Sequence, residues 1–249
     1  MKGVIVAAGL GHRLSPLTLQ CPKPLISVNG QPLIAYTIEA FAHAGFREIG
    51  VVLGYKGHIL ANYLRSVDQD GLVVRCLVNP LYRLGNGSSI YAARHFVGDE
   101  PFVLAMADHL LSVQTLAPLL SQTWAGHVLC VDHEVRHADG LQDATKVWLD
   151  GQGRVLRIGK HLRRWHAVDA GVYLFQSRVF GYLEALINRR RANCSITHLA
   201  RHLIARGDTL HTCDVSGAFW LDVDTPDDLI FARRVLRLGE TPTSLESVA

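Results

Sequence analysis

Short runs of continuously apolar residues alternate with stretches of helical periodicity through the first half of the sequence. Four runs rich in β-branched residues are predicted strands, at residues 3–7, 49–53, 73–78 and 102–106. Helices are predicted between them, at residues 32–44, 58–67 and 89–97. Because strands without polar alternation are buried on both faces, this pattern predicts a parallel sheet covered by helices on both sides, the doubly wound α/β fold. Ligands of such folds lie beyond the carboxyl ends of the strands.

The pattern loosens after about Val131. Shorter strands are predicted at residues 145–149, 154–158, 171–175 and 219–223, and helices at 178–188, 195–205 and 226–238. Thr225 is the predicted N-cap of the last helix, with Pro226 at its first position. Because no linker or repeat interrupts the chain, we expect one domain over residues 1–238, with a second half from about 132 that elaborates the first. Residues 239–249 are predicted to be a flexible tail.

Composition and charge exclude several classes of protein. The 25 basic and 22 acidic residues give a net charge of +3, which does not require a polyanionic partner. Arg189 to Arg191 have no interleaved aromatic residues, so we interpret them as a solvated helix end and expect no nucleic acid partner. No apolar stretch reaches the roughly 18 residues of a membrane span. Five scattered cysteines and the lack of a signal-like leader predict a cytoplasmic protein with reduced thiols.

A glycine-rich loop, Ala7-Ala8-Gly9-Leu10-Gly11-His12-Arg13, follows the first predicted strand directly. Small residues let backbone N–H groups approach a phosphate or a base edge, and Arg13 adds a fork of donors. Ten residues later, prolines on both sides are predicted to hold Lys23 in extended backbone and so present its ammonium group. Alone, the loop could be a tight turn or open a dinucleotide-binding fold, although Leu14 replaces the third glycine of that motif.

Three acidic residues stand where they could hold a metal ion. Asp108 ends a predicted buried strand, where an unpaired carboxylate would cost several kcal/mol. Asp222 and Asp224 are two residues apart in an extended segment and so share a face. A few carboxylates completed by water and phosphate oxygens suit Mg²⁺. Alternatively, Asp108 caps a turn, and Asp224 lies at a helix N-terminus, where acids are favoured in any case.

Taken together, A-A-G-x-G-x-R-L-x-P-L-T at residues 7–18 and P-K-P-L at 22–25 resemble the signature of nucleotidyltransferases that join a nucleoside triphosphate to a phosphorylated sugar, polyol or alcohol. The later motifs are most similar to those of the CTP:inositol-1-phosphate cytidylyltransferases, over residues 1–236. They are G-N-G at 85–87, D-H at 108–109, A-T-K at 144–146, I-G-K at 158–160, D-x-G at 169–171 and W-x-D-V-D-T at 220–225. Residues 28–41 also resemble bacterial phosphocholine cytidylyltransferases. Asp143 and Ala170 replace a glutamate and a threonine of the inositol enzymes, so the acceptor stays open.

The resemblance implies a Rossmann-like, doubly wound mixed sheet with a nucleotide-binding half at about 1–131 and an acceptor-binding half at about 132–238. The nucleotide-binding residues it implies are Ala7, Ala8, Gly9, Gly11, Arg13, Lys23, Asn79, Asn86, Gly87 and Ser88. Arg13, Lys23 and Asp108 would be catalytic, and Asp108, Asp222 and Asp224 would bind magnesium. The acceptor would be bound by Asp143, Lys146, Lys160, Asp169 and Gly171. For Lys146, Lys160 and Asp169, ordinary surface or turn roles stay open.

The function implied is that of a Mg²⁺-dependent cytidylyltransferase, in which CTP and inositol 1-phosphate give CDP-inositol and pyrophosphate. The acceptor phosphate is already a nucleophile, so no Ser-His-Asp arrangement is needed. One alternative is another phosphorylated acceptor, such as a sugar 1-phosphate, phosphocholine or a phosphonate. A non-enzymatic alternative is a nucleotide-sensing regulatory domain of the same fold, which would lack the lysine or one of the metal acids. A homodimer is also left open.

Overall fold

The computed structural model describes residues 1–67, 71–134, 143–190 and 194–237; the predicted tail 239–249 and Arg191 lie outside these ranges. The parallel strands that the first half contributes to the main sheet are β1 (Lys2–Ala7), β4 (Glu48–Leu53), β5 (Val73–Val78) and β6 (Phe102–Met106). β1 pairs in parallel with both β4 and β6, and β4 pairs in parallel with β5. The predicted strand-helix alternation therefore does produce a parallel sheet.

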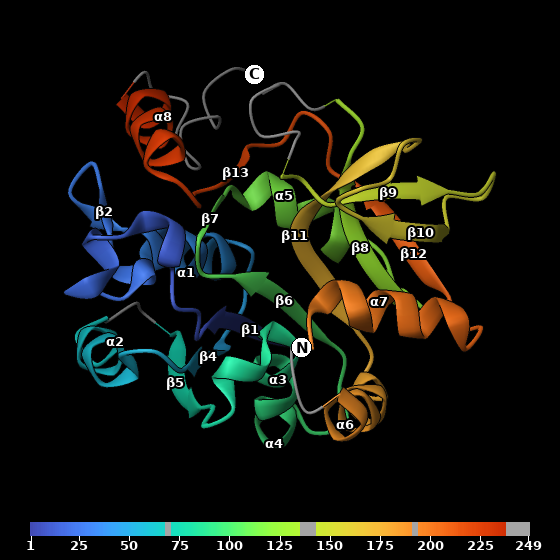
Figure 1. The fold of residues 1–249 in the computed structure, drawn as a ribbon, viewed down its shortest axis with the longest axis horizontal. Coiled ribbons are helices and arrows are strands. Elements are labelled where there is room, and N and C mark those ends of the chain that lie inside the picture. Colours follow the sequence, from blue (N-terminus) through green and yellow to red (C-terminus); the bar gives the residue numbers. More distant parts are fainter. Residues whose placement is uncertain (68–70, 135–142, 191–193, 238–249) are drawn as a thin grey trace.

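Later strands of the chain extend this sheet on the far side of β6 (Figure 1). They are β8 (His127–Asp132), β9 (Lys146–Leu149), β10 (Val155–Gly159), β11 (Ala167–Phe175) and β12 (Leu210–Asp214). β11 is antiparallel to β6, β8 and β9, while β12 is parallel to β8. Together with the four earlier strands they form one nine-stranded sheet. The predicted doubly wound mixed α/β fold is confirmed.

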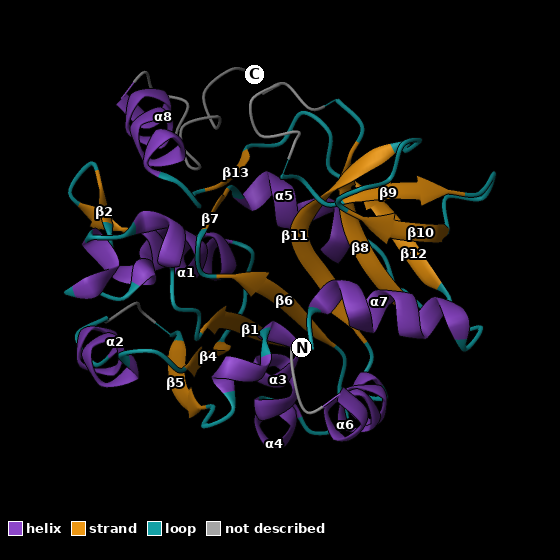
Figure 2. Cartoon of the chain, viewed as in Figure 1, coloured by secondary structure: helices purple, strands orange, loops and turns teal. Residues whose placement is uncertain are grey.

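Helices cover both faces of the sheet (Figure 2). Val4 and Val6 of β1 belong to a core with α3 (Asn86–Ala92), α4 (Arg94–Val97), α6 (Val179–Arg190) and α7 (Ile196–Ala205). Ile5 and Ala7 face the opposite core, with α1 (Leu33–His43), α2 (Gly57–Leu64) and α5 (Val113–Leu120). Successive residues of a strand point to opposite faces, so a continuously apolar strand is the one that two helical layers can bury.

One predicted strand is not covered in this way. β5 pairs only with β4 among the described strands, and all of its residues are partly or fully exposed. Val78, at its end, is 74% exposed. The prediction that this apolar run is buried on both faces was wrong, because β5 lies at the edge of the sheet.

A third core holds the last helix, α8 (Pro226–Arg237), against the N-terminal part of the chain. Leu229 and Leu236 of α8 pack with Leu14, Ile26 and Leu33. The predicted N-cap is confirmed, since Thr225 Oγ1 accepts from Asp228 N at 3.2 Å and Asp228 Oδ2 accepts from Thr225 N at 2.7 Å. None of the described helices is long and apolar enough to cross a membrane.

His127 gives the fold a pH dependence that can be measured. The side chain is fully buried, and its Nδ1 accepts from Gln176 N at 3.2 Å, so the neutral ring carries its proton on Nε2. Burial lowers the pKa of His127 to about 4, although the Asp208 carboxylate 3.4 Å away opposes the change. Between pH 6.5 and 4 the unfolded chain binds a proton that the folded chain does not. The free energy of unfolding should therefore fall as the pH falls through this window.

We expect this histidine to account for roughly 2–3 kcal/mol of stability lost between pH 7.5 and 4.5. Urea unfolding of the wild type and of His127→Gln at both pH values isolates the contribution, because other groups titrate in both proteins. His95→Gln, at an exposed position, is the matched control. An identical pH dependence in wild type and His127→Gln would refute the assignment.

Candidate active site

The glycine loop after β1 is folded directly onto the segment that carries Lys23. Gly11 has a φ of +65°, and a Cβ there would lie 2.9 Å from both Lys23 Cβ and Thr18 Cγ2. Its carbonyl accepts from Thr18 Oγ1 at 3.1 Å. By contrast, a Cβ on Gly9 would meet no atom within 4 Å. The loop therefore has a tightly packed base at Gly11 and an open backbone at Gly9.

Alanine substitutions at these two glycines should differ in their effect on the free energy of unfolding. Gly11→Ala must place an L-residue in the left-handed region and push on Lys23, so we expect it to cost at least about 1–2 kcal/mol of unfolding free energy. Gly9→Ala should leave stability unchanged, because its Cβ would be unopposed. Urea unfolding of both variants tests the pair. Equal stabilities would show that the loop is not anchored at Gly11.

Lys23 begins a short 3₁₀ helix, Lys23–Leu25. Leu25 N donates to Pro22 O at 2.8 Å, and Ile26 N donates to Lys23 O at 3.0 Å. The prediction of extended backbone at Lys23 was wrong, although Pro22 is extended. The first residues of a helical turn need no N–H partner, so Pro24 fits this turn without losing a hydrogen bond.

The ammonium group of Lys23 lies between two carboxylates. Lys23 is 6% exposed, and its Nζ lies 2.6 Å from Asp108 Oδ2 and 2.6 Å from Asp224 Oδ1. Although burial favours the neutral amine, Asp108, Asp222 and Asp224 raise the pKa of Lys23 above its ordinary value. Burial likewise opposes the ionised form of Asp108, but Lys23 and His109 hold the pKa of that carboxyl well below its ordinary value. The Lys23 ammonium is therefore a buried cation between carboxylates.

A small two-stranded sheet brings the acids together. β7 (His109–Leu111) follows β6 after a tight turn and pairs antiparallel with β13 (Trp220–Asp222). In this register Asp222 lies opposite His109, and Val223 N donates to Asp108 O at 3.0 Å. Residues more than a hundred positions apart thus meet beyond the carboxyl end of β6, where ligands of doubly wound folds bind.

Asp108, His109 and Asp222 form a group able to hold a metal ion, with one ligand atom from each residue and all three atoms within 4.8 Å of one another. Asp222 Oδ1 is buried and lacks a hydrogen-bond partner in the described part of the chain. Burial raises the pKa of Asp222 to about 7, since His109 offsets only part of the cost of an anion beside Asp108 and Asp224. An unpartnered carboxylate oxygen among other acids fits a divalent cation.

The three acids predicted to bind a metal lie close together in the structure, but they contact different partners. Asp224 accepts from Lys23 and from Arg13 Nη2, whereas Asp222 faces His109. No role was predicted for His109 from the sequence. Its position directly after Asp108, in the D-H motif, was the available signal. Although burial disfavours the charged ring, Asp222 and Asp108 raise the pKa of His109 to about 9.

Arg13 connects the glycine loop to predicted acceptor residues. Its Nη1 donates to Asp143 Oδ2 at 2.9 Å, and Asp143 Oδ1 lies 3.9 Å from Lys160 Nζ. Lys146 Nζ donates to the carbonyl of Lys160 at 3.0 Å. The structure therefore gathers Asp143, Lys146 and Lys160 beside Arg13. That they bind an acceptor stays a prediction.

Asp169 and Gly171 lie where β11 departs from regular pairing with β8. Asp169 Oδ1 accepts from Gly171 N at 2.8 Å, and its Oδ2 accepts from the Tyr173 hydroxyl. Burial raises the pKa of Asp169. Gly171 has a φ of +75°, and a Cβ there would lie 2.2 Å from His109 Nε2. This irregular stretch of β11 thus packs against the metal-ligand group.

The predicted base-binding residues form a loop whose polar groups are largely used internally. Asn79 is buried, and its Nδ2 donates to Ser88 Oγ at 3.1 Å and Ser89 Oγ at 3.0 Å. Asn86 Oδ1 accepts from Ile196 N at 2.8 Å, and Gly87 N donates to Cys194 O at 2.8 Å. These contacts shape the loop and anchor it to the start of α7. Contact with a base stays a prediction.

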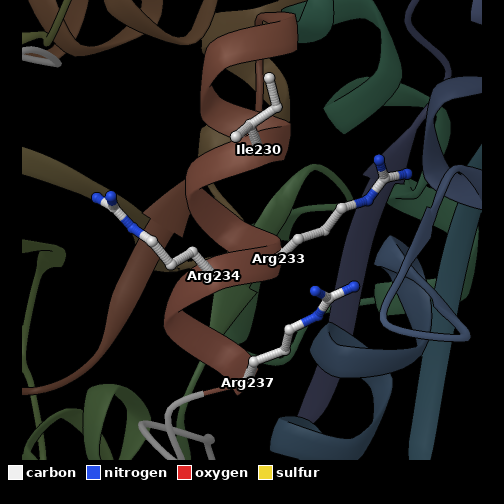
Figure 3. Close-up of a pocket in the computed structure, with 4 residues that line it drawn as sticks. All are labelled: Ile230, Arg233, Arg234 and Arg237. Atoms are coloured by element: carbon white, nitrogen blue, oxygen red, sulfur yellow. The ribbon is translucent and has the colours of Figure 1, made fainter.

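A separate hollow lies on α8 (Figure 3). Its lining residues are Ile230, Arg233, Arg234 and Arg237. Arg233 Nη2 donates to Ser27 O at 3.0 Å and so ties the helix to β2 (Ser27–Val28), which pairs with β3 (Gln31–Pro32). The hollow shares no residue with the acid cluster.

Comparison with known proteins agrees with this geometry. A family model described as nucleotidyl transferase matches residues 2–237. The chain belongs to the nucleotidyl transferase family. The predicted family and class of enzyme are confirmed.

Two curated relatives are about twice as long as the part that this chain matches. The chain is 38% identical over 228 residues to the "Bifunctional IPC transferase and DIPP synthase" of Rubrobacter xylanophilus, covering 90% of this chain and 49% of the relative. It is 34% identical over 237 residues to the protein of the same name from Archaeoglobus fulgidus, covering 95% and 44%. The chain thus spans about half the length of these relatives. The solved inositol-1-phosphate CTP transferase of T. maritima has the same fold, with a TM-score of 0.86, 23% identity and coverage of 100% of this chain and 97% of that one.

Proposed function

We propose that this chain is a divalent-metal-dependent cytidylyltransferase that converts CTP and inositol 1-phosphate to CDP-inositol and pyrophosphate. The observation that carries the proposal is the buried Lys23 ammonium, 2.6 Å from both Asp108 and Asp224 and packed against Gly11 of the glycine loop. The names of the 38% and 34% identical relatives, IPC transferases, support it. So does the resemblance of the motifs to the inositol-phosphate enzymes.

The reaction requires two phosphate groups that repel each other to come together. An oxygen of the acceptor phosphate attacks the α-phosphorus of CTP, the bond to the pyrophosphate group breaks, and no covalent enzyme intermediate forms. Lys23 and Arg13 supply positive charge to the phosphates, and the backbone of residues 8–11 approaches the nucleotide closely. A divalent cation bound by Asp108 and Asp222 would supply further charge neutralisation on the triphosphate.

The ion pairs of the site suit the binding of phosphate groups. Lys23 and Arg13 are held by Asp108, Asp224 and Asp143. When nucleotide binds, we expect the two cationic side chains to exchange these carboxylate oxygens for phosphate oxygens. The carboxylates they leave are then available to a divalent cation. The preformed pairs thus keep both cations in place before substrate arrives, which lowers the cost of ordering them.

Fewer observations bear on the identity of the acceptor than on the binding of the nucleotide. Lys146 and Lys160 would hold its phosphate, while Asp143 and Asp169 would accept from its hydroxyl groups. Asp169 already accepts from Gly171 N and Tyr173, which fixes the direction of its carboxylate. Another phosphorylated acceptor would use the same attack on the α-phosphate. A homodimer and a cytoplasmic location stay predictions.

A pyrophosphate-release screen tests the proposal. Each of the four nucleoside triphosphates is paired with inositol 1-phosphate, phosphocholine, 2-aminoethylphosphonate and hexose 1-phosphates. We expect release with CTP and inositol 1-phosphate. Release with a different acceptor would replace the acceptor and keep the class of reaction. No release with any pair would contradict an enzyme and favour the nucleotide-sensing alternative.

A further inference from the structure

His109 Nδ1 lies at distances from two carboxylate oxygens that are typical of atoms bound to one metal ion. Its Nδ1 lies 3.0 Å from Asp108 Oδ1 and 3.9 Å from Asp222 Oδ1. Ligand atoms about 2.1 Å from a common divalent cation are roughly 3 to 4 Å from one another. Both distances from Nδ1 fall in this range, so the imidazole nitrogen is placed as a ligand atom would be.

Asp222 provides an independent sign that this group of side chains binds a cation. Its Oδ1 is buried without a hydrogen-bond partner in the described residues, and 3.9 Å is too long for a hydrogen bond to Nδ1. Buried ionisable oxygens are normally paired or bound to a metal. A cation shared with His109 Nδ1 would satisfy Asp222 Oδ1 and would replace the hydrogen bond between Nδ1 and Asp108 Oδ1.

The ring is held in this place from the opposite side by β11. At Gly171 a Cβ would lie 2.2 Å from Nε2 and 2.5 Å from Cδ2 of His109, so any side chain there would displace the ring. Thr37 Oγ1 also donates to the backbone carbonyl of His109 at 2.8 Å. His109 is therefore a buried side chain fixed on both its backbone and its ring, as an oriented metal ligand requires.

We propose that His109 is itself a ligand of the divalent cation, which gives the centre two carboxylates and one imidazole. This inference rests on the proposed function only in that the site binds a metal. An imidazole nitrogen favours transition metals such as Mn²⁺ and Co²⁺ relative to Mg²⁺, which prefers oxygen. The centre should consequently discriminate against Mg²⁺ more strongly than one made of carboxylates alone.

The test is made on the full chain with Mn²⁺ and without nucleotide. Pulsed electron paramagnetic resonance of the Mn²⁺-bound protein should show modulation from a coordinated ¹⁴N nucleus. His109→Asn should lose this modulation, whereas His95→Asn, a control at an exposed histidine, should keep it. Gly171→Ala keeps His109 but displaces its ring, so it should also lose the modulation, with circular dichroism to check that it folds.

A second measurement separates a ligand from a hydrogen-bond partner of Asp108. A partner that only orients Asp108 would weaken Co²⁺ and Mg²⁺ together, by about 10- to 100-fold, and leave their affinity ratio unchanged. A ligand lost in His109→Asn should lower the Co²⁺ to Mg²⁺ affinity ratio measured by calorimetry. An unchanged ratio would overturn the proposal. Wild-type protein without ¹⁴N modulation, or His109→Asn that retains it, would also overturn it.

Pyrophosphate release by the same preparations distinguishes the two proposals. Wild-type release without nitrogen coordination would leave the cytidylyltransferase in place and reject His109 as a ligand. Nitrogen coordination without release on any substrate pair would reject the cytidylyltransferase and keep the metal centre.

Discussion

Replacing Lys23 with alanine is expected to lower turnover by about two orders of magnitude or more, the size of the loss seen when one transition-state donor is removed. Lys23 is the buried cation between Asp108 and Asp224, beneath the loop proposed to hold the triphosphate. Without it, the acids would face the incoming phosphates with less compensating charge. Steady-state pyrophosphate release under saturating CTP measures the effect.

Lys56→Ala is the matched control for this substitution. The Lys56 ammonium donates to the Leu19 carbonyl and is not part of the acid cluster. We expect its turnover to stay within a few-fold of wild type. Urea unfolding of both variants shows whether Lys23→Ala is folded, since removing the lysine leaves three acids with fewer cations. A folded Lys23→Ala protein with near-normal turnover would remove Lys23 from the reaction.

Asp108→Ala should have an effect of similar size, about two or more orders of magnitude in turnover. Asp108 accepts from Lys23 and is bonded to His109 Nδ1 at 3.0 Å, so its loss removes one proposed metal ligand and loosens the other two groups. A higher divalent metal concentration should recover only part of the rate. Pyrophosphate release titrated with metal measures both effects.

Asp227→Ala, in the exposed first turn of α8, provides the comparison for Asp108→Ala. It removes one carboxylate without touching the cluster, so turnover and metal dependence should match wild type. If Asp108→Ala turned over at a normal rate with an unchanged metal requirement, Asp108 would be a structural acid at a strand end, as its sequence position also allowed.

The regular part of the fold was predictable because burial on two faces leaves a strong pattern. β1, β4 and β6 are uninterrupted apolar runs, and the structure confirms them as strands of the parallel sheet. The edge position of β5 was missed, although Arg75, an exposed charged residue in the middle of Val73–Val78, interrupts the apolar run and argues against burial on both faces. β12 was missed because polar residues interrupt it: of Leu210–Asp214 only Leu210 and Cys213 are buried apolar side chains, which is too few to show a strand pattern.

Breaks within helices and very short strands were also not predictable from the sequence. The segment 89–97 was predicted as one helix, but the structure has α3 and α4 separated at Ala93. Nothing in its apolar spacing marks this break. Short elements such as β7, with three residues, carry too few positions to show any period.

The candidate site could be predicted as a set of residues but not as a geometry. Lys23, Asp108 and Asp224 were named from motifs, and the structure brings them into contact. The role open to His109 depends on its register opposite Asp222 and on the bare Cα of Gly171, 62 positions later. Such pairings arise from the sheet topology, which local sequence patterns do not specify.

In the proposed reaction the acceptor phosphate attacks the α-phosphate of CTP directly. The fate of labelled oxygen is the most direct test of this step. Inositol 1-phosphate with ¹⁸O in its non-ester phosphate oxygens is incubated with CTP, a divalent metal and the chain. The products are then analysed by mass spectrometry. Direct attack predicts CDP-inositol that retains all of the label and pyrophosphate that contains none. Labelled pyrophosphate, or CMP without CDP-inositol, would contradict it.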